Sequence, residues 1–175
     1  MLTISILVNE SDTVPALTEN SVKDNNDMPG HLARRFQQIA VAVFLAEVGE
    51  AGFDLTPVQY AALATIKANP GLDQVTLAGL IAYDRTTITG VVDRLVQKGL
   101  AERRANPHDR RARELEITEE GRRTLRKITP AVESAQAIML RGLSAREGQV
   151  LMRLLRKAIA AGNDLSRAPL RGIQA

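Results

Sequence analysis

The fold of this chain is decided by residues 77–103, which read LAGLIAYDRTTITGVVDRLVQKGLAER. The first part of this stretch predicts a short helix over residues 77–82, with Thr76 as its N-terminal cap. After a tight link, Asp84 is suited to cap a second helix, which extends to about residue 98. Two short helices joined by a link of two or three residues are typical of a helix-turn-helix.

A β-hairpin is predicted directly downstream of these two helices. Residues 100–105 and 112–117 have the composition of strands, and in the second of them Leu115 and Ile117 fall on one face. The segment between them contains Asn-Pro-His-Asp, a turn sequence with proline at its second position. A hairpin in this place is a wing, so we expect residues 54–118 to form a winged helix-turn-helix DNA-binding domain.

Further helices are predicted on both sides of this domain. Residues 31–52 carry apolar side chains at steps of three and four, which indicates one amphipathic helix. A second helix should begin with Thr56 as its cap and end near residue 69. Residues 119–162 predict two more helices. The expected fold class is therefore mainly α with a small β-wing, a winged helix-turn-helix domain plus a helical region.

The net charge of +3 is unevenly distributed along the 175 residues. Residues 1–30 contain one lysine and five acidic residues, and we expect them to form a mobile acidic arm. Residues 83–113 contain eight basic and four acidic side chains. Such a local excess indicates a polyanionic partner, although a solvated charged face is the commoner meaning of charge runs. Residues 163–175 are predicted to be a loose C-terminal tail.

The composition disfavours several functional classes. The absence of cysteine excludes disulfides, thiolate nucleophiles and thiol-based redox sensing. His31 and His108 are the only histidines, so we predict no metal site, no cofactor and no enzymatic activity. No apolar run approaches the roughly 18 residues of a membrane span, and residues 2–8 lack the basic start of a signal peptide. A cytoplasmic protein with no membrane partner is expected.

The helix after the turn is predicted to contact the major groove, because the first residues of this helix do so in a helix-turn-helix. Hydroxyl groups suit phosphates and base edges, and arginine can bridge a guanine or hold a phosphate. An arginine on a narrow hairpin can also enter the minor groove. A solvated surface turn is the alternative for an isolated hairpin. The predicted contacts are Arg85, Thr86, Thr87, Thr89 and Gly90 on the helix, with Arg110 and Arg111 on the wing.

Residues 77–95 and 98–103, followed by DRRA at 109–112 and LEITEEG at 115–121, resemble the DNA-binding region of the MarR family. The resemblance extends over residues 31–162. It implies a homodimeric transcription factor in which residues 31–52 and 119–162 form the dimerisation region. It also implies that Arg111 enters the minor groove, that Asp109 supports the wing, and that Arg94 lies near Asp109 and the DNA backbone. A two-fold dimer requires a pseudo-palindromic operator on double-stranded DNA.

Gly90 departs from the family pattern, because many relatives have a larger and often basic side chain at this position. Glycine inside a helix costs up to about 1 kcal/mol relative to alanine. The residue either allows a close approach of DNA or indicates weak base reading there, and both interpretations stay open.

The resemblance also implies a small-molecule effector, because relatives commonly release DNA on binding small aromatic acids. A cation beside an aromatic-lined cleft would suit an aromatic carboxylate. The candidate effector residues are His31, Arg34, Arg35, Phe36 and Tyr60. A core position for Phe36 and solvated arginines are the alternative interpretation. We therefore expect a repressor released by an aromatic acid, the alternative being an effector-independent architectural DNA-binding protein.

Overall fold

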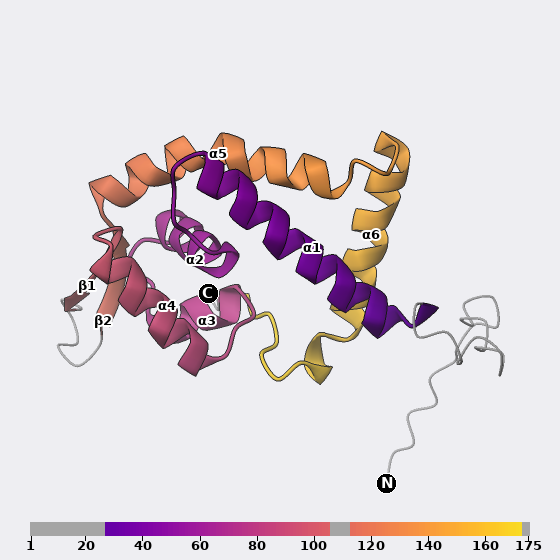
Figure 1. Cartoon of the computed structure of the whole chain (residues 1–175). Helices are drawn as coiled ribbons and strands as arrows, with labels where there is room; N and C mark the ends of the chain where they lie inside the picture. The colour runs from indigo at the N-terminus through magenta and orange to yellow at the C-terminus, as the bar shows by residue number, and fades with distance from the viewer. Residues whose placement is uncertain (1–26, 106–112, 173–175) are drawn as a thin grey trace, which may run out of the picture. The chain divides into compact units, whose positions relative to one another are not determined.

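The computed structural model of the chain describes residues 27–105 and 113–172. Its helices are α1 (Pro29–Glu50), α2 (Pro57–Ala68), α3 (Gln74–Leu80), α4 (Arg85–Gln97), α5 (Glu119–Met139) and α6 (Ala145–Ala161), followed by a 3-10 helix (Asn163–Leu165). The two strands are β1 (Ala101–Ala105) and β2 (Arg113–Ile117) (Figure 1). The predicted class, mainly α with a small β-wing, is confirmed. The chain divides into two compact units between Ile39 and Ala40, within α1.

Side chains at the predicted positions cap the helices α2 and α4. The Thr56 hydroxyl accepts the N–H of Gln59 at 3.3 Å, and the Gln59 side chain in turn accepts the N–H of Thr56 at 3.2 Å. Asp84 accepts the N–H of Thr87 at 2.9 Å and thereby starts α4. Each of these bonds satisfies an N–H that has no partner inside its helix.

The start of α3 differs from the prediction, because Asp73 and not Thr76 is its N-terminal cap. One carboxylate oxygen of Asp73 accepts the N–H groups of Val75 and Thr76, at 2.7 and 2.8 Å. The other oxygen accepts the Thr76 hydroxyl at 3.0 Å. A carboxylate has more acceptor sites than a hydroxyl, so Asp73 satisfies two helix N–H groups at once and Thr76 becomes a donor in the first turn.

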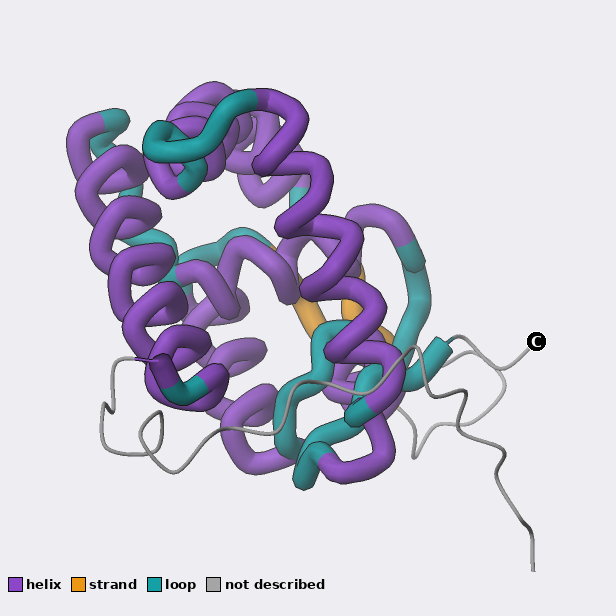
Figure 2. Tube along the Cα trace, turned by 90° about the vertical axis from the view of Figure 1, so that its right-hand side faces the viewer, coloured by secondary structure: helices purple, strands orange, loops and turns teal. Residues whose placement is uncertain are grey.

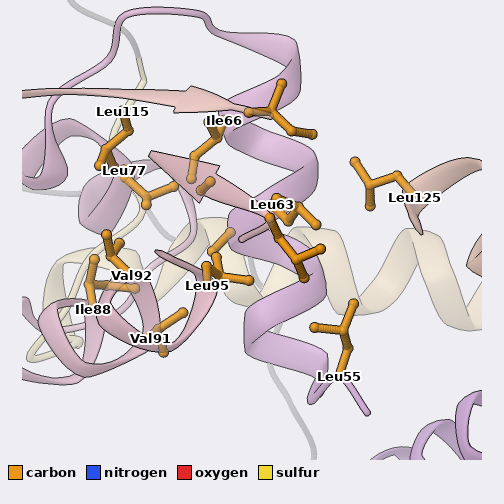
Figure 3. Close-up of a cluster of buried hydrophobic side chains, with 14 of the residues drawn as sticks. Leu55, Leu63, Ile66, Leu77, Ile88, Val91, Val92, Leu95, Leu115 and Leu125 are labelled. Atoms are coloured by element: carbon orange, nitrogen blue, oxygen red, sulfur yellow. The ribbon is translucent and has the colours of Figure 1, made fainter. Parts of the chain in front are cut away.

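The apolar faces of α2, α3, α4 and β2 meet in one core (Figure 3). Four apolar side chains at helical spacing in α4 are buried: Ile88, Val91, Val92 and Leu95. Leu63 and Ile66 of α2, Leu77 of α3 and Leu115 of β2 are at most 1% exposed. Burial of each such side chain stabilises the fold by roughly 1.5–3 kcal/mol. This packing holds α4, the second helix of the helix-turn-helix, against α2, α3 and β2.

The wing is a two-stranded antiparallel sheet, whose strands are orange in Figure 2. Ala101 lies opposite Ile117 and Ala105 opposite Arg113. The predicted wing tip, residues 106–112, lies outside the described residues. The base of the hairpin meets the start of α5, where the N–H of Thr118 donates to the carbonyl oxygen of Leu100 at 3.1 Å. Gly121 is so close to this carbonyl that a Cβ there would lie 2.1 Å from its oxygen.

The segment that follows α6 is held against the protein, whereas the sequence predicted a loose tail over residues 163–175. The Asn163 side chain accepts the N–H of Leu170 at 2.8 Å and donates to its carbonyl oxygen at 3.1 Å. The N–H of Arg171 donates to the carbonyl oxygen of Gly79 in α3 at 2.9 Å. The sequence did not predict these contacts of residues 163–172, because they join distant parts of the chain.

Two further predictions concern the acidic arm at the N-terminus and the absence of a membrane span. Most of the predicted arm, residues 1–26, lies outside the described residues, and α1 begins within the arm's expected range, at Pro29. No helix within residues 27–105 and 113–172 is both long and apolar enough to cross a bilayer.

Candidate nucleic-acid interface

The N-terminal half of α4 presents the predicted contact residues to solvent. Arg85, Thr86, Thr87, Thr89 and Gly90 are all exposed, while the apolar side chains of the same helix face the core. The helix is therefore anchored on one side and polar on the other, which is the arrangement that a helix inserted into a groove requires.

The hydroxyl groups on this face are not equally available to DNA. Thr87 donates its hydroxyl to Asp84 at 2.6 Å. Thr89 donates to the carbonyl oxygen of Arg85 at 2.9 Å and accepts from Gln74 at 2.7 Å. The Thr86 hydroxyl has no hydrogen-bond partner among the described residues. Arg85 and Thr86 are thus the donors best placed to reach a ligand, and Thr87 and Thr89 offer mainly their methyl groups.

Asp84 acts as the helix cap that the sequence predicted. Hydrogen bonds from the Thr87 hydroxyl, and then from the Thr87 N–H, hold the pKa of the Asp84 carboxyl below its ordinary value of 3.8. The carboxylate therefore stays ionised at neutral pH, and its negative charge lies at the positive end of α4. This agrees with its interpretation as a structural residue.

A network that the sequence did not predict fixes α4 relative to its neighbours. Arg103 on β1 bonds Asp93 on α4 at 2.6 Å and Gln74 on α3 at 3.5 Å. Gln74 in turn donates to Thr89. Three elements are thereby joined through polar side chains next to the exposed face. The chain separation of 15 residues between Gln74 and Thr89 leaves no local signal from which this contact could have been predicted.

Arg94 is exposed in the last turn of α4. This end of α4 lies near the loop before α2, because Lys98 contacts Asp54 in that loop. Lys98 bonds the Asp54 carboxylate at 2.7 Å and lowers the pKa of that carboxyl, and Arg94 lowers it further through its charge. The predicted neighbour of Arg94, Asp109, lies outside the described residues. The same holds for Arg110 and Arg111, so the wing contacts stay predictions.

Gly90 faces open space among the described residues, since apart from its own helix backbone none of their atoms lies within 4 Å of the position that a Cβ would occupy. No packing contact of the described residues therefore requires glycine at this position. The two interpretations raised by the sequence, a close approach of DNA and weak base reading, both concern contacts with DNA and both remain.

Tyr60 lies on α2, away from the exposed face of α4, where a hollow opens between α2 and α5. Its ring is 5.9 Å from that of Phe44, at an angle of 58°. Tyr60, Lys67, Leu125 and Thr129 are among the residues that line this hollow of about 300 Å³. The sequence analysis missed Lys67, although a residue seven positions after Tyr60 on a helix falls on the same face.

The other candidate effector residues lie in the first turns of α1, in the compact unit that ends at Ile39. Arg34 and Arg35 are exposed, and His31 and Phe36 are half-buried. One guanidinium nitrogen of Arg34 lies 3.5 Å from the imidazole of His31. Tyr60 belongs to the second unit, so the described structure does not establish one joint site for these five residues.

Comparison with known proteins assigns this architecture to a family. A family model described as the MarR family matches residues 53–112. Over 141 residues the chain is 30% identical to the transcriptional repressor NicR of Pseudomonas putida, which covers 81% of this chain and 88% of NicR. The chain belongs to the MarR family. The MarR family and its member NicR are transcriptional regulators and not enzymes. The winged-helix fold that the resemblance implies for this chain is confirmed.

Two solved structures of the MarR family show the same fold in proteins that bind ligands. The PcaV regulator of Streptomyces coelicolor, in complex with its natural ligand, is 37% identical with a TM-score of 0.72, covering 79% of this chain and 96% of that one. BpsR of Bordetella bronchiseptica, whose DNA binding is regulated by 6-hydroxynicotinic acid, is 28% identical with a TM-score of 0.72. The match covers 77% of this chain and 95% of BpsR.

Proposed function

We propose that this MarR-family regulator is a homodimeric repressor that binds a pseudo-palindromic double-stranded DNA operator and is released by a small aromatic acid. The observation that carries the DNA-binding part is the exposed face of α4, where Arg85 and Thr86 project from a helix held by a buried apolar stripe. We propose a cytoplasmic location, because a repressor of this kind acts where the chromosome lies.

The wing is the decisive test of the DNA contact. Arg111→Ala should weaken operator binding at least about tenfold, since an arginine in the minor groove contributes both charge and shape recognition. Arg141→Ala, which removes an exposed arginine between α5 and α6, is the matched control. Binding is measured by fluorescence anisotropy at fixed salt on DNA flanking the gene, with dimerisation checked by light scattering. An unchanged affinity of the Arg111 variant would overturn the wing assignment.

The homodimer is supported by an apolar surface on α6, part of the proposed dimerisation region of residues 31–52 and 119–162. Among the described residues, α6 buries only Gly148. Val150 and Leu154, one turn apart, are 39% and 49% exposed, and they line a largely apolar hollow of about 380 Å³. A charged side chain at position 154 would oppose the burial of this surface against a second copy of the chain. Leu154→Glu should therefore yield a monomer in light scattering, and a stable dimer of this variant would contradict the proposal.

The effector part is supported by the relatives and by the hollow on α2. BpsR responds to 6-hydroxynicotinic acid, an aromatic acid. In this chain the Tyr60 ring and the Lys67 ammonium line one hollow, a combination that suits an aromatic carboxylate. His31, Arg34, Arg35 and Phe36 on α1 are separate candidate effector residues, proposed from the resemblance to the family and not from this hollow.

The effector is tested by calorimetry with hydroxybenzoates and 6-hydroxynicotinic acid, together with operator release. Lys67→Ala should weaken binding of the acid, whereas Lys127→Ala, an exposed lysine on α5, should not. If no acid produces heat and operator affinity is the same with every acid, the protein is an effector-independent architectural DNA-binding protein.

A further inference from the structure

The C-terminal segment 166–172 lies against α3 and the start of α4. It contains Arg167 and Arg171 and no acidic residue. Three hydrogen bonds hold its far end. The Asn163 amide donates to the carbonyl oxygen of Leu170 and accepts the N–H of Leu170, and the N–H of Arg171 donates to the carbonyl oxygen of Gly79. The segment therefore has a defined position next to the exposed face of α4.

Gly79 makes this close contact possible. A Cβ at position 79 would lie 3.2 Å from the Cβ of Arg171, a distance at which the segment would have to shift. Glycine destabilises a helix interior relative to alanine. At position 79, however, the missing side chain lets segment 166–172 approach the backbone of α3 closely. The contact thus depends on a specific residue of the DNA-binding domain.

Arg167 and Arg171 enlarge the cationic surface around Arg85. All three arginines line one open cleft of about 180 Å³, together with Gly79, Tyr83 and Asp84. None of the three guanidinium groups forms an ion pair with the residues that the structure describes. The one acidic group in the cleft, Asp84, accepts hydrogen bonds from Thr87. The cleft therefore offers an excess of positive charge to an anion.

We propose that segment 166–172 extends the DNA interface, with Arg167 and Arg171 holding backbone phosphates beside the one reached by Arg85. This inference rests on the proposed function, because it requires α4 to lie on DNA. In a helix-turn-helix the first helix crosses the DNA backbone while the second enters the major groove. The segment is anchored on that first helix, α3, so its arginines lie on the side where phosphates pass.

The experiment measures how binding depends on salt. The probe is a mixed-sequence duplex of about 30 bp, roughly three helical turns, because phosphate contacts do not depend on sequence. Each neutralised phosphate contributes about 0.9 to the slope of log affinity against log salt. Arg167→Ala with Arg171→Ala should therefore reduce the slope by up to about 3.6 for two protomers and weaken binding about tenfold or more. The matched control is Lys127→Ala with Arg141→Ala, two exposed basic residues that line neither the cleft at Arg85 nor the apolar hollow at Val150 and Leu154.

Two further variants separate a phosphate contact from a purely structural role. Arg167→Lys with Arg171→Lys keeps both charges and should keep the slope. Asn163→Ala removes the clamp on Leu170 while keeping both arginines, and it should give a smaller slope than the wild type. Weaker binding of the double alanine variant at an unchanged slope would show that the segment only supports α3, and would overturn the proposal.

The remaining outcomes are also distinguishable. If the wild type binds the duplex and the double alanine variant has the same affinity and slope, the segment makes no DNA contact and only this inference fails. If the wild type does not bind any duplex, the proposed function fails as well. A stabilisation by inorganic phosphate that the double variant loses, with the DNA slope unchanged, would show a site for free anions and would equally overturn it.

Discussion

Replacing Gly121 with alanine should destabilise the protein, although alanine is the better helix former. The added methyl group would lie 2.1 Å from the carbonyl oxygen of Leu100 and 2.8 Å from a side-chain carbon of Ile117. The Leu100 carbonyl is a backbone group that also accepts the N–H of Thr118, so it cannot move without breaking the junction between the wing and α5. Overpacking of this kind costs about 1–3 kcal/mol, and a backbone contact this short favours the upper end.

The alanine also contributes helix propensity, which offsets up to about 1 kcal/mol of this cost. The expected net loss for Gly121→Ala is therefore about 2 kcal/mol, or roughly 4–8 °C in Tm for a domain of this size. Gly90→Ala is the matched control, because it makes the same chemical change in a helix where the rest of the described structure leaves 4 Å of space around the new Cβ. That variant should gain up to about 1 kcal/mol.

Both variants are measured by urea unfolding at one fixed protein concentration, since dimerisation makes stability depend on concentration. The comparison depends on opposite signs: a lower urea midpoint for the Gly121 variant and an equal or higher one for the Gly90 variant. If both midpoints rise together, the close contact at Leu100 does not constrain position 121, and the reasoning is refuted.

Three further predictions follow from the caps and the polar network. The pKa of Asp84 is lowered by Thr87, so its carboxylate stabilises the fold above its ordinary value of 3.8 and this stabilisation is lost as the pH falls through the lower folded value. Asp84→Asn should therefore lose less Tm than the wild type between about pH 4 and pH 2, and equal losses would contradict this. Arg103→Ala removes the bond to Asp93 and should weaken DNA binding while the free energy of unfolding falls by less than about 1 kcal/mol; unchanged DNA affinity would show that the network does not position α4. Thr56→Ala should cost about 1 kcal/mol in urea unfolding, and Thr56→Ser should restore most of it.

Local patterns predicted what lies within a turn or two of the chain. Asp84 caps α4 through a residue three positions away, and the four buried side chains of α4 recur at helical spacing, so both were visible in the sequence. The start of α3 was harder, because Asp73 and Thr76 are both good caps and lie in the same turn. Only their geometry decides between them, since one carboxylate can accept both N–H groups.

Contacts between distant segments were not predictable in this way. The bond between Gly79 and Arg171 joins residues 92 positions apart, and the contacts of Gln74 depend on how α3, α4 and β1 pack. The hollow at Tyr60 and Lys67 is an intermediate case. The two residues share a helical face, but the opposite wall comes from α5, which no local pattern places there.

The polar network around α4 has a consequence for the free energy of DNA binding. Because Arg103, Gln74 and Thr89 are joined in the free protein, their side chains are already ordered before DNA arrives. Ordering a flexible side chain at an interface costs about 0.5–1.5 kcal/mol, so a helix fixed in advance avoids part of the entropy loss on association. Loss of this network, as in the Arg103→Ala variant, should therefore raise the entropy cost of DNA binding without removing a contact to DNA.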